Sequence, residues 1–117
     1  MDDIPPRRPL FWEGSAKEEF MTFPLLVRKD LGVALFVVQI GEMPSSAKPW
    51  KGLGPGIYEL VDHHRGDTYR AVYTLRIAGN IHVLHAFQKK STQGIKTPKH
   101  EIDLIKDRLK RLKEMLK

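Results

Sequence analysis

The stretch that decides the fold is IYELVDHHRGDTYRAVYTLRIAGNIHVLHAFQK, residues 57–89. Its β-branched and aromatic residues alternate with polar ones, and turn residues interrupt the pattern, which predicts three strands. The expected strands are 57–63, 68–77 and 81–89. The connections between them are His64 to Asp67 and the pair Gly79-Asn80, and connections this short place neighbouring strands antiparallel. We therefore expect a small antiparallel sheet.

The alternation assigns the side chains of this sheet to two faces. A two-residue turn at Gly79-Asn80 would set Arg70 opposite Lys89 and Val72 opposite Phe87. The first face then holds Glu59, Val61, Arg70, Val72, His85, Phe87 and Lys89. The second face holds Tyr58, Leu60, Tyr69, Ala71, Tyr73, Leu75, Leu84 and Ala86. The second face is apolar and is expected to pack on the helices.

The first face is mixed in character and allows two interpretations. In one, Arg70 and Lys89 take the oxygens of an anionic, phosphate-bearing substrate. In the other, Glu59 and Arg70 form a cross-strand ion pair on a solvated face.

Three helices are expected around the sheet. Ser15 is a fair N-cap, with Glu18 as its capping-box partner, for a short helix over 16–22. The 24–41 stretch has apolar residues at helical spacing, and this pattern favours a helix, although 33–38 also reads as a buried strand. A last helix begins with Thr97 as N-cap and Pro98 in its first turn. Its apolar seam is Ile102, Ile105, Leu109, Leu112 and Leu116.

Outside these elements the chain is rich in proline and glycine. Residues 1–9 predict a flexible arm, residues 10–12 a short strand, and residues 10–117 a single domain. Residues 43–56 predict a long loop, which carries Lys48, Trp50 and Lys51. Such a trio can grip a phosphate and stack a base, or Trp50 can simply plug the core.

Composition narrows the functional classes. The chain has no cysteine, which excludes thiolate metal sites and disulfides, and its longest apolar run, 33–38, is far short of the ~20 residues that span a bilayer. No phosphate-binding glycine motif and no metal-ligand spacing is present, so we expect no cofactor and no metal. The absence of cysteine fits a reducing cytosol, so we expect a cytoplasmic protein. The net charge of +6 lies wholly in residues 88–117, because the charges of residues 1–87 cancel. A polyanionic partner fits this excess, as does a merely soluble basic helix.

A set of ordered motifs resembles the phage-derived HigB-like toxins of the RelE/ParE superfamily. They are Ile57-Tyr58-Glu59-Leu60, Gly66-Asp67-Thr68-Tyr69-Arg70-Ala71-Val72-Tyr73, Val83-Leu84-His85-Ala86-Phe87-Gln88-Lys89-Lys90-Ser91 and Gly94-Ile95-Lys96-Thr97-Pro98. The segments Trp12-Glu13-Gly14-Ser15, Gln39-Ile40-Gly41 and Lys48-Pro49-Trp50-Lys51-Gly52 fit as well. The resemblance covers roughly residues 10–110. It implies a compact α+β fold with helices on one face of a small antiparallel sheet, and it implies that 24–41 is a helix.

The resemblance also implies a function. Toxins of this kind are neutralised by a separate helix-turn-helix antitoxin and cut mRNA on the ribosome without a metal. Carried over by motif position, Arg70 and Lys89 would stabilise the phosphate and the transition state, and Glu59 would orient Arg70 or act as a base. Phe87 would shape or stack the RNA, with Lys90 and Lys48 as further RNA contacts.

Two other functions stay open at this point. The ParE branch of the superfamily shares the fold and poisons DNA gyrase without cutting RNA, and a non-toxic nucleic-acid-binding protein would carry the same charge. No His or Tyr follows the last helix to supply acid–base chemistry, so the sequence leaves the general acid and base unassigned.

Overall fold

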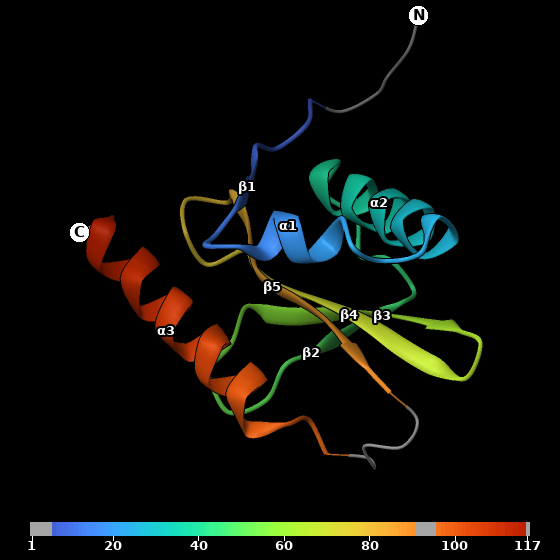
Figure 1. Cartoon of the computed structure of the whole chain (residues 1–117). Coiled ribbons are helices and arrows are strands. Elements are labelled where there is room, and N and C mark those ends of the chain that lie inside the picture. Colours follow the sequence, from blue (N-terminus) through green and yellow to red (C-terminus); the bar gives the residue numbers. More distant parts are fainter. Residues whose placement is uncertain (1–5, 91–95, 117) are drawn as a thin grey trace, which may run out of the picture.

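A computed structural model describes residues 6–90 and 96–116, and it has an α+β fold (Figure 1). Its elements are β1 (Leu10–Trp12), α1 (Ala16–Phe20), α2 (Leu25–Gln39), β2 (Ala47–Pro49), β3 (Ile57–His64), β4 (Asp67–Thr74), β5 (Ile81–Lys89) and α3 (Lys99–Met115). The strands form one sheet in the order β1-β5-β4-β3-β2. Only the β1–β5 pair is parallel. The predicted fold class and antiparallel core are confirmed.

The first central connection is shorter than expected. β3 continues to His64 and β4 begins at Asp67, so only Arg65 and Gly66 remain in the turn. Both have positive φ, 50° and 86°, the conformation that a two-residue turn needs to match the twist of its strands. Glycine adopts it freely at position 66.

The second central connection is longer than expected, and the prediction of a two-residue turn at Gly79-Asn80 is wrong. β4 ends at Thr74, so residues 75–80 form the connection. The hydroxyl of Thr74 accepts a hydrogen bond from the amide of Arg76 at 3.2 Å and donates one to the carbonyl of Gly56 at 3.0 Å. These side-chain bonds compete with the strand ladder and end β4 three residues early.

The longer turn shifts the register by two residues but keeps the faces. Arg70 pairs with Phe87, not with Lys89, and Val72 pairs with His85. Because a shift of two preserves the alternation, the predicted membership of the first face holds for these strands. A β-bulge between Val72 and Tyr73 leaves Leu84 unpaired and turns its side chain to the first face, so its assignment to the second face is wrong.

The helices agree well with the apolar periodicity. α2 buries Val27, Leu31, Ala34, Leu35 and Val38, which are the residues whose spacing favoured a helix over a strand. α3 starts at Lys99 with Pro98 as its N-cap, so the predicted cap at Thr97 is off by one residue. Ser15 does precede α1, but its side chain makes no capping bond and instead donates to the carboxylate of Glu19, four residues on.

The helices do not all lie on one face of the sheet, contrary to the expectation (Figure 1). α1 and α2 pack on the second face, against residues such as Leu60, Tyr73 and Val83. α3 packs on the first face, where Ile105, Leu109 and Leu112 meet Val72, Leu84 and Phe87. α3 therefore covers the apolar part of the mixed face and leaves its charged part outside the helix contact.

Two peripheral segments are more ordered than expected. The predicted loop 43–56 contains β2, which adds a strand to β3. In the expected arm, Arg8 exchanges hydrogen bonds with Gln39 and the guanidinium of Arg7 lies 4.7 Å from the ring centre of Phe36. Residues 6–9 thus lie against the folded part, while residues 1–5 are outside the described residues.

Within the described ranges, none of the helices combines the length and the apolar character that crossing a bilayer requires.

Candidate functional site

The charged part of the first face brings together four of the predicted site residues. Glu59, Arg70 and Lys89 come from β3, β4 and β5, and alternate positions place all three on one face. Lys48 of β2 pairs directly with Glu59 and so shares that face. The sheet thus presents three cations around one carboxylate.

An ion pair joins Glu59 to Arg70 in this group. Their side chains are in contact and are only 13% and 19% exposed. Since Glu59 pairs with Val72 and Arg70 with Val61, the contact runs diagonally across the two strands. The predicted ion pair between Glu59 and Arg70 is therefore confirmed. It is partly buried, whereas the prediction placed it on a solvated face. The Nε–H of Arg70 is also buried, with no hydrogen-bond partner among the described residues.

Lys89 is the most buried of the cations, with 6% of its surface exposed. Burial lowers the pKa of its ammonium, the charge of Arg70 lowers it further, and Glu59 opposes both. The sheet face thus combines the guanidinium of Arg70 with a buried lysine whose ammonium has a lowered pKa.

The remaining predicted residues divide between surface and core. Lys48 and Lys90 are exposed, at the two edges of the charged part. Phe87 is only 5% exposed and stacks on His85 with the ring centres 5.2 Å apart, so stacking on an RNA base does not fit its position. Trp50 is 8% exposed within the α3 cluster, which favours the plug over the base-stacking interpretation. Ser91, Gly94 and Ile95 of the family motifs lie outside the described residues.

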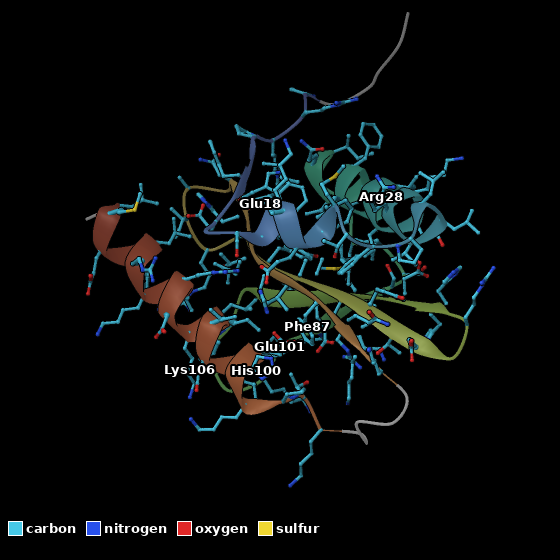
Figure 2. The ribbon with its side chains drawn as sticks, viewed as in Figure 1. Glu18, Arg28, Phe87, His100, Glu101 and Lys106 are labelled. Atoms are coloured by element: carbon cyan, nitrogen blue, oxygen red, sulfur yellow. The ribbon has the colours of Figure 1, made fainter. Side chains whose placement is uncertain are left out.

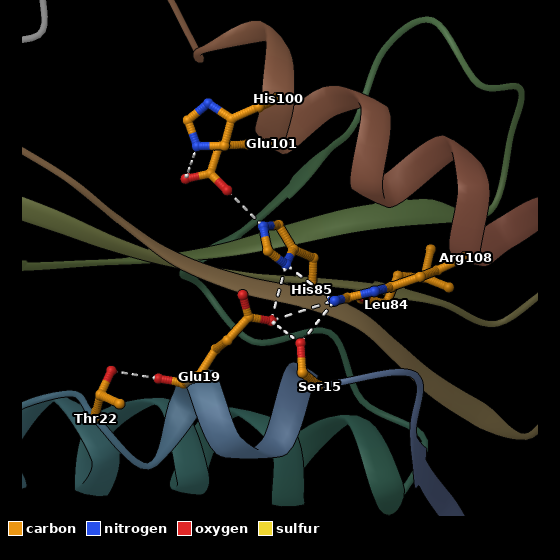
Figure 3. Close-up of polar contacts among 8 residues, drawn as sticks. All are labelled: Ser15, Glu19, Thr22, Leu84, His85, His100, Glu101 and Arg108. Atoms are coloured by element: carbon orange, nitrogen blue, oxygen red, sulfur yellow. Dashed lines mark hydrogen bonds and ion pairs between the residues drawn. The ribbon is translucent and has the colours of Figure 1, made fainter.

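A buried polar cluster that the sequence did not predict lies beside this site (Figure 3). Arg108 is only 8% exposed, and its guanidinium reaches from α3 to β5 and to the start of α1. Its Nη1 donates to the carbonyl of Leu84 at 3.0 Å and to Glu19 at 3.2 Å, and its Nη2 donates to Ser15 at 2.8 Å. We call Ser15, Glu19, His85, Glu101 and Arg108 the α3 clamp, because they tie α3 to β5 and α1.

His85 sits at the centre of the clamp with no exposed surface. Its Nε2 lies 2.7 Å from the carboxylate of Glu101, which can only accept, so this nitrogen carries a proton. Its Nδ1 lies 3.1 Å from Nη1 of Arg108, which can only donate, and 3.3 Å from Glu19. The neutral Nε2–H tautomer satisfies both strong contacts. The imidazole of His85 also stacks on Phe87. Because Phe87 pairs with Arg70, this stacking connects the clamp to the charged part of the first face.

One signal in the sequence pointed to the clamp. Arg108 falls between Ile105, Leu109 and Leu112 on the apolar seam of the last helix, where a charged residue needs a buried partner. Gly14 completes the arrangement: its φ is +54°, and a Cβ there would lie 2.7 Å from Nε of Arg108.

Figure 2 shows Phe87 and Glu101 near each other where β5 passes the start of α3. Among residues 6–90 and 96–116, no three His, Asp or Glu side chains gather in a way that would hold a metal ion.

Comparison with known protein families identifies the family of this chain. The model of the family described as "Phage derived protein Gp49-like (DUF891)" matches residues 18–110. The chain belongs to the Gp49-like family. The match spans most of the chain, from α1 to α3, and it is consistent with the resemblance to HigB-like toxins. No curated protein matches this Gp49-like chain.

Two solved structures are similar to this chain. A double mutant of the Escherichia coli toxin RelE in the free state superimposes with a TM-score of 0.59 at 19% identity, covering 90% of this chain and 97% of that one. The RelBE2 toxin–antitoxin complex of Mycobacterium tuberculosis gives a TM-score of 0.48 at 18% identity, covering 78% and 99%. The first of these shows that the Gp49-like chain has a RelE-like fold.

The electrostatic coupling at the site predicts how the Lys89 pKa responds to its neighbours. Arg70→Gln removes a cation that lowers this pKa, so the pKa rises; Glu59→Gln removes the opposing anion, so the pKa falls. Side-chain NMR titration of Lys89 measures both shifts. Arg111→Gln removes an exposed cation of α3 and should leave the value unchanged. A fall in Arg70→Gln would contradict the coupling.

The clamp predicts a large cost for removing its guanidinium. Arg108→Met leaves Glu19 and the carbonyl of Leu84 without their donor, which should lower the free energy of unfolding by about 3 kcal/mol. Urea denaturation followed by circular dichroism measures it. Lys110→Met changes an exposed residue of the same helix and should cost under about 0.5 kcal/mol. Equal stabilities of the two variants would show that the clamp is not a stabilising unit.

Proposed function

We propose that this protein is the toxin of a type II toxin–antitoxin system and that it cleaves mRNA on the ribosome without a metal. The observation that carries the proposal is the group of Glu59, Arg70 and Lys89 on one face of the sheet, outside the apolar contact with α3. Membership of the Gp49-like family and the fold shared with the toxin RelE support it. The partners in this proposal are the ribosome with its mRNA and a helix-turn-helix antitoxin, in the cytoplasm.

The chemistry needs only the RNA and side chains. The ribose 2′-OH attacks the neighbouring phosphorus, the P–O bond to the next ribose breaks, and a 2′,3′-cyclic phosphate and a free 5′-OH result. Arg70 holds the phosphate oxygens and stabilises the charge that builds up on them. Glu59 fixes the direction of the guanidinium through their ion pair. Lys48 and Lys90 bind the flanking phosphates.

Lys89 is the residue that we assign to proton transfer. Burial and the charge of Arg70 lower the pKa of its ammonium. In the proposed step Lys89 takes the 2′-OH proton and, as the ammonium, gives a proton to the leaving 5′ oxygen. Phe87 keeps a supporting role, because it pairs with Arg70 on the neighbouring strand and lies beside it on the same face.

The proposal is tested by toxicity. Induced expression without antitoxin should stop growth and translation, and Arg70→Ala or Lys89→Ala should relieve the arrest, since losing one transition-state donor costs about 10²–10³ in rate. Colony counts and incorporation of labelled amino acid measure the effect. Lys110→Ala, an exposed cation of α3, should stay toxic.

Two results would contradict the proposal. If both site variants keep their circular dichroism spectra and remain fully toxic, the sheet face is not the active surface. If the purified protein inhibits DNA gyrase in a supercoiling assay while translation continues, the non-enzymatic ParE-like alternative holds instead.

A further inference from the structure

His63, near the end of β3, lies on the first face of the sheet and is exposed. β3 and β4 pair without interruption over Ile57–His64, so the side chains of β3 alternate strictly between the two faces. His63 therefore shares the face of Glu59, whereas the neighbouring His64 points to the other side. The ring contacts agree, because His64 lies against Tyr69 of the core under α1 and α2.

The strand register places His63 in one row with Lys89. His63 pairs with Thr68 on β4, and Thr68 pairs with Lys89 on β5. Neighbouring strands lie about 4.8 Å apart, so the backbones of His63 and Lys89 are separated by about 10 Å, with β4 between them. The expected register, with Arg70 opposite Lys89, would have put Val61 in this row instead. The shift of two residues thus brings an imidazole into line with the buried lysine.

The strand between these two groups carries the guanidinium that can hold a phosphate. Arg70 is two residues from Thr68 on β4 and lies on the same face. A phosphate bound by Arg70 over β4 would therefore have His63 on one side and Lys89 on the other. Both side chains can exchange a proton, and they stand on opposite flanks of the phosphate.

Displacement at phosphorus favours two such groups over one. The attacking and the leaving oxygen stand roughly in line on opposite sides of the phosphorus, so a single side chain would have to move from one to the other. A base on one flank and an acid on the other meet both oxygens at once. Imidazole suits proton transfer well, because it is the side chain whose charge changes most readily near neutral pH.

The surroundings indicate which group takes which role. Lys89 is only 6% exposed, and burial disfavours its charged form, which suits it to take a proton. His63 is exposed, so water can solvate the charged imidazolium that an acid must start from.

We propose that His63 is the general acid of the proposed RNA cleavage and that Lys89 is its general base. Lys89 takes the proton of the 2′-OH as the bond between O2′ and phosphorus forms. The imidazolium of His63 gives its proton to the 5′ oxygen as the bond between phosphorus and O5′ breaks. Lys89 then loses a proton to water and His63 gains one, which restores both groups. This inference rests on the proposed function and divides between two side chains the proton transfers that Lys89 alone would otherwise make.

The test compares two model mRNAs in a ribosome-dependent cleavage assay with the purified chain. One carries the natural 5′ oxygen at the mapped cleavage site, and the other carries sulfur there, which leaves without an acid because the pKa of a thiol is about 8.5. His63→Gln should slow cleavage of the oxygen mRNA by about 10²-fold or more and leave the sulfur mRNA within about threefold of the wild type. Lys89→Met should be slow on both mRNAs, because the base is still needed. His64→Gln changes the adjacent histidine on the opposite face and should match the wild type on both.

The failures of this inference and of the proposed function are distinguishable. If the wild type cleaves the oxygen mRNA and a folded His63→Gln is as fast as His64→Gln, His63 is not the acid and the proposed function stands. The same conclusion follows if His63→Gln is slowed equally on both mRNAs, or if sulfur restores the rate of Lys89→Met. No cleavage of the oxygen mRNA by the wild type would overturn the proposed function and the role of His63 with it.

Discussion

The contacts of Arg108 set the position of α3, and the position of α3 determines which part of the sheet is left for chemistry. One guanidinium donates to α1, to the backbone of β5 and toward His85, all from a side chain that is almost entirely buried. A buried cation needs such a complete set of partners, because each unmet hydrogen bond would cost about 1–3 kcal/mol. The β-bulge supplies the partner on β5: it leaves Leu84 out of the strand pairing and frees its carbonyl for Arg108.

The bulge and the clamp together divide the first face of the sheet. Leu84 turns toward α3 and joins Val72 and Phe87 in an apolar contact with the helix. The same face carries Glu59 level with Val72, Arg70 level with Phe87, and Lys89 two residues nearer the turn at Arg65-Gly66. The charged residues thus lie beside the apolar contact, one on each of the three central strands. The proposed chemistry uses the polar part, and the core uses the rest.

Much of this arrangement could be predicted from residue patterns, and the misses have physical causes. Helical spacing in 24–41 anticipated the buried side of α2, and strand alternation placed Glu59, Arg70 and Lys89 on one face despite the wrong register. The register was wrong because the Thr74 hydroxyl ends β4 early, a competition between side chain and backbone that alternation does not reveal. The face of Leu84 and the place of α3 were wrong because a single-residue bulge has no reliable sequence signature. The exposure of Phe87 was misjudged for the same reason, since α3 covers it.

The central claim is that the charged part of the sheet cuts mRNA during translation. Mapping of mRNA 5′ ends after induction tests it most directly, in cells that express the wild-type chain or Arg70→Ala. The account predicts new 5′-hydroxyl ends within translated regions for the wild type, and their loss in Arg70→Ala while the variant remains folded. Growth arrest by the wild type with no new mRNA ends would contradict it.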